Sequence, residues 1–146
     1  MAHDFSATAR QLAPYNILGS PGQLVAIDGR CLSGKTSMGR FLAWHFNSSL
    51  IESDLFLKGN GEVDYRLGEI RRIINGRLKR GRSVFIEGIT VLKTLQAIGR
   101  KPDVLVYVTR LNNPNYDSFD AVLTKYEQMF APQAAANVVV EHAWTD

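Results

Sequence analysis

The sequence lacks the features that would place it outside the ordinary globular proteins. Cys31 is the only cysteine, which excludes an intrachain disulfide and fits a reducing, cytoplasmic compartment. No apolar run approaches the roughly 20 residues that cross a bilayer, and the amino-terminal residues lack the pattern of a secretion signal. His, Cys and carboxylate residues nowhere show the spacing of a zinc site. We therefore expect a cytoplasmic protein without a membrane span.

Charge of neither sign dominates the chain. The net charge is +3, and the basic residues gather in the segment 66–82. This segment has two interpretations, a nucleic-acid-binding patch or the solvent-exposed face of a helix. Its apolar residues keep helical spacing and no aromatic stacking platform accompanies it, so we expect the second and no nucleic-acid partner.

The length and composition indicate one domain with a short extension. At 146 residues, 45% hydrophobic and 21% charged, the chain is typical of a globular protein. Residues 1–22 are expected to be an N-terminal extension and residues 23–146 the domain. Within the extension, Phe5, Ala9 and Leu12 predict one amphipathic turn packed on the domain edge. This segment is also where a partner contact is expected, and the oligomeric state is left open.

Short apolar runs predict five strands, and helical patterns lie between them. A continuous run without polar residues is typical of a strand that is buried on both faces. The predicted strands are Leu24–Asp28, Leu50–Glu52, Ser83–Glu87, Asp103–Val108 and Asn137–Glu141.

Apolar residues at steps of three and four predict four helices. Their apolar faces run from Met38 to Phe46, from Leu67 to Leu78, from Leu92 to Ile98 and from Phe119 to Phe130. For the second helix, Asp64 is the expected N-cap and Gly81 the expected stop. Strands that alternate with helices through short connections indicate an α/β protein, in which a parallel sheet lies between helices.

One stretch carries a chemical motif. Gly29 to Thr36 reads GRCLSGKT and satisfies G-x-x-x-x-G-K-[ST], the phosphate-binding loop or P-loop. The apolar strand LVAID precedes it and a helical pattern follows, which is the structural context that the motif requires. Glycines let the backbone approach an anion closely, and successive amide groups then point at the phosphates. The residues expected to bind the nucleotide are Gly29, Arg30, Cys31, Leu32, Ser33, Gly34, Lys35, Thr36 and Ser37.

Two side chains of the loop have distinct expected roles. The Lys35 ammonium would lie against the β- and γ-phosphates of ATP, and the Thr36 hydroxyl would bind Mg²⁺. Cys31 is either a small filler in the loop or a redox-sensitive thiol, since a neighbouring cation favours the thiolate.

Further segments resemble one enzyme family. Asp28-Gly29, Ser53-Asp54 with Phe56, Val63-Asp64-Tyr65 and the run Phe85 to Ile89 follow one another in its order. Together they are similar to the uridine kinase-like small-molecule kinases, a group that includes nicotinamide riboside kinase. The resemblance covers roughly residues 23–110. It implies a three-layer P-loop NTPase fold with sheet order 2-3-1-4-5, and phosphoryl transfer from ATP to a hydroxyl of a small molecule.

Two carboxylates match the family's functional acids. Asp54 corresponds to the general base for the acceptor hydroxyl, and Glu87 to the acid that steadies Mg²⁺ or contacts the substrate. The alternatives are a turn cap for Asp54 and a structural acid for Glu87. Asp28, which also ends a buried strand, either reaches metal-bound water or a substrate hydroxyl, or caps the loop.

The sequence departs from the family where an arginine-rich lid is expected. After the fourth strand, Arg110 is the only arginine and Lys125 the only other cation up to Gln133. A well-placed arginine contributes roughly 10³-fold or more to phosphoryl transfer. Arg110 is the candidate in this chain for the catalytic role; the alternatives are an arginine from a partner and slow turnover. The expected function is therefore a Mg-ATP-dependent small-molecule kinase, with a nucleotide-binding regulatory or accessory module as the alternative and a GTPase as a third possibility.

Overall fold

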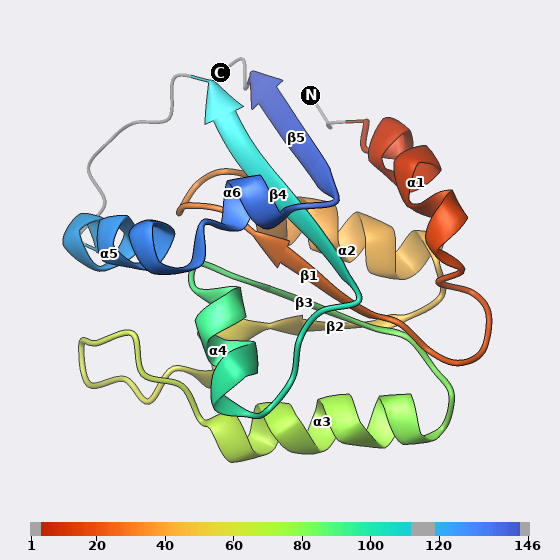
Figure 1. The fold of residues 1–146 in the computed structure, drawn as a ribbon, viewed down its shortest axis with the longest axis horizontal. Helices are drawn as coiled ribbons and strands as arrows, with labels where there is room; N and C mark the ends of the chain where they lie inside the picture. The colour runs from red at the N-terminus through yellow and green to blue at the C-terminus, as the bar shows by residue number, and fades with distance from the viewer. Residues whose placement is uncertain (1–3, 112–118, 144–146) are drawn as a thin grey trace.

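The computed structural model describes residues 4–111 and 119–143, which form a parallel sheet between two layers of helices (Figure 1). Its five strands are ordered β2-β3-β1-β4-β5, and each neighbouring pair is parallel. The predicted fold class and strand order are confirmed. The strands are β1 (Leu24–Asp28), β2 (Ser49–Glu52), β3 (Val84–Gly88), β4 (Val104–Leu111) and β5 (Val138–Ala143).

The strand bounds agree with the predictions to within one residue, except at the far ends of β4 and β5. β4 continues beyond the predicted Val108 to Leu111, and β5 continues beyond Glu141 to Ala143. In this extension Arg110 pairs with His142 in the ladder. Backbone pairing here continues beyond the apolar run, which in β4 ends with the last buried residue, Val108.

The helices follow the predicted alternation. They are α1 (Ser6–Leu12), α2 (Lys35–His45), α3 (Leu67–Lys79), α4 (Val91–Ala97), α5 (Asp120–Phe130) and the short α6 (Pro132–Ala135), with 3₁₀ turns at Ala13–Tyr15 and Ser53–Phe56. None of the helices in the described ranges is long and apolar enough to cross a membrane.

Of the two predictions for the ends of α3, one agrees with the structure and one does not. Gly81 adopts a φ of +70° just after the helix, as expected of a helix stop. The Asp64 cap was wrong, because α3 begins only at Leu67 and Arg66 precedes it. Residues 57–65 instead close a loop in which the Lys58 amide donates to the Asp64 carbonyl at 2.9 Å. Asp64 is therefore held in the loop and not at the helix end.

Each face of the sheet has its own core. Alternate residues of β1 point to opposite faces, so Val25 and Ile27 join one cluster and Leu24 and Ala26 the other. The first cluster lies under α1 and α2, and includes Leu12, Met38, Leu42 and Phe46. The second lies under α3 and α4, and includes Ile70, Ile74, Val91 and Leu95. The loops at the strand ends are thereby held on a rigid base.

Helix α1 packs on the outer part of the first face. Phe5, Ala9 and Leu12 are buried in the cluster that contains Val138 of the edge strand β5, as the sequence predicted. The Phe5 ring also meets the His142 ring edge-on, with centroids 5.6 Å apart. The division of the chain at residue 22 stays a prediction, while the packing of α1 on the sheet is a property of the fold.

Candidate functional site

The phosphate-loop motif forms the turn between β1 and α2. Leu32 and Gly34 have positive φ angles of 61° and 95°, and α2 begins immediately afterwards at Lys35. Left-handed residues within a turn direct successive amides to one side, which makes a concavity that suits an anion. The loop thus has the backbone form that the motif predicts.

Gly29 lets this loop pass close to the neighbouring strand. A Cβ atom at Gly29 would lie 2.4 Å from the Val108 carbonyl oxygen and 2.7 Å from the Ser33 hydroxyl. Both distances are shorter than any real contact of a Cβ atom. The absence of a side chain at Gly29 therefore sets how tightly the loop sits against β4.

Lys35 reaches back across the loop. Its Nζ donates to the Arg30 carbonyl at 3.1 Å, although the residue is only 8% exposed. An ammonium group that is largely shielded from water interacts strongly with nearby charge. The Lys35 ammonium therefore lies against the backbone of the turn.

Thr36 and Glu87 lie side by side at the mouth of the loop. The Thr36 hydroxyl donates to Glu87 Oε1 at 3.0 Å. Glu87 is the last residue but one of β3, a strand that is buried throughout, and is only 2% exposed. Burial raises the pKa of Glu87, and the Lys35 charge and the Thr36 hydrogen bond oppose that rise. A nearby cation stabilises the charged form of a buried carboxylate.

These residues open onto a single cavity. It has a volume of about 330 Å³ and is lined by Lys35, Thr36, Asp54 and Glu87, together with Tyr65 and others. Asp54 comes from the 3₁₀ turn after β2 and is exposed to solvent within the cavity. Tyr65 is buried, and this burial raises the pKa of its hydroxyl. The structure thus brings together six of the predicted site residues at the carboxyl edge of the sheet, since Cys31 and Leu32 also line the cavity.

Oxygen atoms in this cavity suit a hard divalent cation. The Thr36 hydroxyl and the Glu87 carboxylate are the kind of ligands that Mg²⁺ uses alongside phosphate oxygens and water. Within residues 4–111 and 119–143 no three His, Cys, Asp or Glu side chains are grouped as a metal cage. Thr36 and Glu87 are the protein groups of this cavity that could hold such a cation.

The two predicted arginines lie apart from the cavity lining. Arg30 turns its guanidinium toward α5, where Nε meets Glu127 at 2.6 Å and Nη1 pairs with Asp120. Arg110 of β4 donates from Nη1 to the Leu32 carbonyl at 3.4 Å, so it contacts the loop although it does not line the cavity. The remaining lid segment, residues 112–118, lies outside the described residues. Cys31 is half-buried and lines the cavity.

Asp28 lies beneath the loop and is 1% exposed. Its Oδ1 accepts a hydrogen bond from the Gly29 amide at 2.8 Å, and its Oδ2 accepts one from the Tyr126 hydroxyl. Burial raises the pKa of Asp28 to about 7, although both hydrogen bonds and Lys35 work against the rise. Of the two interpretations of Asp28, these contacts support the loop cap.

Two partners of the loop were missed from the sequence. Tyr126 and Glu127 lie on α5, almost a hundred positions from Asp28 and Arg30, and the local pattern there marks only a helix. Tyr126 falls on the apolar stripe of α5 and carries no sign of a polar role. An excess of acids on the face of α5, Asp120 with Glu127, was the one available signal.

Solved structures with the same fold include several kinases. A protein described as a possible uridine kinase, from Bacillus stearothermophilus, aligns over 93% of this chain and 96% of its own, with 16% identity and a TM-score of 0.64. Thymidylate kinase from Candida albicans aligns over 85% of this chain and 84% of its own, with 13% identity and a TM-score of 0.55. A sugar kinase from Janibacter aligns over 84% and 86%, with 14% identity and a TM-score of 0.50.

The comparisons support the fold that the resemblance implied. At these identities the likeness is one of architecture, and that architecture is the fold of the uridine kinase-like P-loop kinases. No protein-family model matches the sequence, and no curated protein does.

Proposed function

We propose that the protein transfers the γ-phosphoryl group of Mg-ATP to a hydroxyl group of a small molecule. The observation that supports this most directly is the common cavity of Lys35, Thr36, Asp54 and Glu87. Phosphoryl transfer needs neutralised phosphate charge, a positioned metal and an aligned acceptor oxygen. These four side chains supply a cation, two oxygen ligands and a base.

The phosphates would lie in the turn of residues 29–37. Its amides would bind their oxygens, and Lys35 would exchange its bond to the Arg30 carbonyl for the β- and γ-phosphates. Thr36 and Glu87 would hold Mg²⁺, which when bound neutralises charge that builds up on the transferred group. Glu87 is already preorganised for this by its hydrogen bond from Thr36.

Asp54 would accept the proton of the acceptor hydroxyl. It lies on the same cavity as Lys35 but is exposed, so an acceptor can reach it from solvent. A general base must come within hydrogen-bonding reach of the hydroxyl that it deprotonates. Arg110, which contacts the loop at the Leu32 carbonyl, is the cation we assign to the oxygens of the transferred phosphoryl group.

The alternative function is that of a nucleotide-binding regulatory module, and it is favoured because arginines near the site are paired with acidic side chains. The Arg30 guanidinium is taken up by Glu127 and Asp120, and the Arg40 guanidinium pairs with Glu52 at 2.6 Å. The undescribed residues 112–118 contain no lysine or arginine in the sequence. Phosphoryl transfer with only one arginine to contact the phosphates would be slow, whereas nucleotide binding would be unaffected.

One panel of reactions tests the choice. The purified protein is given Mg-ATP with nucleosides, vitamins and sugars, and ADP release is measured. Release that depends on an acceptor and falls at least about 100-fold in Asp54→Asn, with ATP binding retained, supports the kinase. The matched variant is Asp64→Asn, at a half-buried aspartate that pairs with Lys58 and does not line the cavity, and it should keep full turnover.

The same panel can contradict the proposal. ATP binding without acceptor-dependent release across the panel favours the regulatory module. Turnover that survives Asp54→Asn removes this residue from the role of base. Lys35→Ala should abolish tight triphosphate binding under both functions, so binding that persists in Lys35→Ala would contradict the site itself. Competition by GTP, CTP and UTP in the binding assay identifies the donor.

A further inference from the structure

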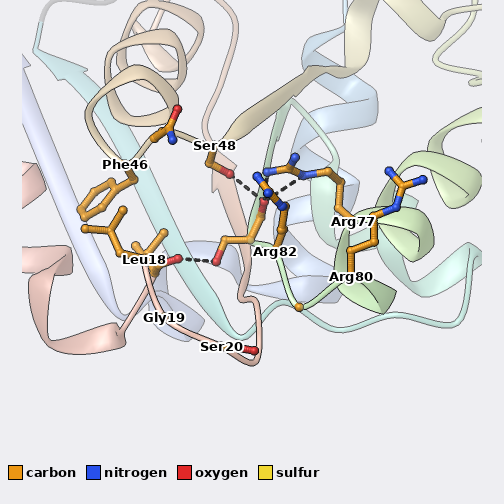
Figure 2. Close-up of a pocket in the computed structure, with 12 residues that line it drawn as sticks. Leu18, Gly19, Ser20, Phe46, Ser48, Arg77, Arg80 and Arg82 are labelled. Carbon is orange, nitrogen blue, oxygen red and sulfur yellow. Dashed lines mark hydrogen bonds between the residues drawn. The ribbon is translucent and has the colours of Figure 1, made fainter.

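A second hollow lies at the opposite edge of the sheet. It has a volume of about 350 Å³ and is lined by residues 17–20, 46–48, 77 and 80–83 (Figure 2). Ser48 directly precedes β2 and Ser83 directly precedes β3, so the hollow is at the amino ends of the strands. The phosphate loop follows their carboxyl ends. A five-residue strand at about 3.3 Å per residue puts the two places roughly 15 Å apart.

The charge of this hollow is entirely positive. Arg77, Arg80 and Arg82 line it, and no aspartate or glutamate does. Among the described residues, none of these three arginines belongs to an ion pair. Three like charges around one concavity repel one another, and a bound anion would relieve that repulsion.

Arg77 is fixed in place. Its Nε and Nη2 donate to the Ser83 carbonyl at 3.3 and 3.0 Å, and the Ser48 hydroxyl donates to the same oxygen at 2.7 Å (Figure 2). Arg77 is half-buried, whereas Arg80 and Arg82 are exposed. One guanidinium is thus preorganised and two can adjust, which is a suitable arrangement for gripping a ligand.

The dipole of α3 explains only some of the arginines that line the hollow. Basic residues in the last turn of α3 favour its C-terminal charge, and Arg77 and Lys79 suffice for that. Arg82 lies beyond the helix and is brought back by the left-handed turn at Gly81, with its amide bonded to the Arg77 carbonyl at 3.0 Å. Ser20 closes the other side, since a Cβ at Gly81 would lie 2.8 Å from the Ser20 hydroxyl.

We infer that this hollow binds the phosphate group of a small phosphorylated molecule. Guanidinium groups match phosphate oxygens with paired hydrogen bonds, and the hydroxyl of Ser20 and the amide of Asn47 line the same space. Phe46 and Leu18 offer apolar contact for the organic part. The volume is at the lower end of the roughly 300–1,000 Å³ of small-molecule sites. The site is separate from the proposed phosphoryl transfer and does not depend on it.

The experiment measures binding with the phosphate loop disabled. In a Lys35→Ala background, inorganic pyrophosphate and ribose 5-phosphate are titrated calorimetrically at fixed ionic strength. The double variant Arg80→Ala with Arg82→Ala should weaken both at least about tenfold, because two charge-assisted contacts are lost. The matched control, Arg71→Ala with Arg72→Ala, removes the same charge from exposed residues of α3 outside the hollow and should stay within about twofold.

Other results overturn the inference. The absence of saturable binding by either probe in the Lys35→Ala protein would show that the hollow takes no phosphate. Equal weakening in both double variants would show a diffuse basic surface of the kind that binds a polynucleotide, and single-stranded RNA would then compete. Circular dichroism of each variant confirms that a loss of binding is not a loss of folding. Arg77→Lys provides a second test, since it keeps the charge but loses the paired geometry and should also weaken binding.

Discussion

The Tyr126 hydroxyl donates a hydrogen bond to the Asp28 carboxylate and so joins α5 to the carboxyl end of the central strand. The same hydroxyl accepts a hydrogen bond from the Leu92 amide of α4 at 3.1 Å. Three elements therefore meet in one buried polar contact directly beneath the phosphate loop. Because Arg30 in the loop also binds Glu127 of α5, the loop and α5 are linked at two points.

Asp28→Asn should flatten the pH dependence of stability. An aspartate of the unfolded chain has a pKa of about 3.9, whereas burial raises the pKa of Asp28 to about 7. Between these values the folded state binds more protons, so the free energy of unfolding falls as pH rises, by up to roughly 4 kcal/mol. The stabilisation is fully present below about pH 4 and is lost by about pH 7. Urea unfolding at a series of pH values measures it.

The control for this experiment is Asp64→Asn, which changes a half-buried aspartate that pairs with Lys58 near the surface. It should leave the slope of the wild-type protein unchanged between the two pH values. If Asp28→Asn retains the full slope, other groups carry the pH dependence and Asp28 is charged in the folded state near neutral pH.

Gly29→Ala should displace the phosphate loop. The new methyl group would meet the backbone oxygen of Val108 at 2.4 Å, and a strand backbone cannot move aside cheaply. We expect a loss of stability of about 1–3 kcal/mol and at least about tenfold weaker nucleotide binding. Thermal unfolding with and without Mg-ATP measures both effects.

Gly76→Ala is the matched control for the loop variant. Nothing lies within 4 Å of a Cβ at Gly76, and the residue is inside α3. Alanine favours a helix over glycine by about 1 kcal/mol, so this variant should be more stable and bind nucleotide normally. An unaltered Gly29→Ala protein would contradict the close approach of the loop to β4.

Glu87→Gln should separate metal-dependent from metal-free nucleotide binding. The substitution keeps the shape of the side chain and removes its charge. Burial raises the pKa of Glu87 and so already disfavours the charged form, and the fold should therefore persist without it. The gain in nucleotide affinity on adding Mg²⁺ should fall at least about tenfold, while binding in EDTA changes little. Fluorescent nucleotide titration with and without Mg²⁺ measures the difference.

Glu52→Gln is the corresponding control at the end of β2. Glu52 pairs with Arg40 on the surface and does not line the cavity. Its magnesium effect should match that of the wild-type protein. An undiminished magnesium effect in Glu87→Gln would instead assign the metal to Thr36 and the phosphates alone.

Leu12→Ala should test whether α1 is part of the core. Leu12 is completely buried in the cluster that holds β1 and β4. Removing a buried leucine side chain costs about 2–5 kcal/mol, which is a large part of the stability of an ordinary domain. Guanidinium unfolding measures the loss. Leu18→Ala, at a residue 73% exposed, should change stability by less than about 0.5 kcal/mol.

The fold was predictable because apolar runs and helical periodicity mark buried faces. Leu24–Asp28 was placed to the residue, since all five of its residues are buried and a turn motif follows. The hydropathy pattern does not predict element ends that are set by backbone hydrogen bonds and not by burial. The outer end of β4 is stabilised by pairing with β5, and residues 57–65 by a closed loop, so neither the end at Leu111 nor the start of α3 at Leu67 was found.

The candidate site was predictable where residues are consecutive in the chain. The motif of residues 29–36 and the acids at strand ends follow from one topological rule, that parallel strands end at one edge. The roles of Lys35, Thr36, Asp54 and Glu87 stay predictions, although the cavity unites their side chains. Contacts such as Asp28 with Tyr126 leave no local pattern.

The packing of α1 against β5 has a consequence for synthesis on the ribosome. Helix α1 emerges from the exit tunnel before every strand. Part of the apolar surface on which it packs is Val138, near the end of the described chain. Until β5 has emerged, Phe5, Ala9 and Leu12 have no complete surface on which to bury their side chains. The nascent chain therefore exposes a short apolar helix through most of translation, and a holding chaperone would find its binding segment there.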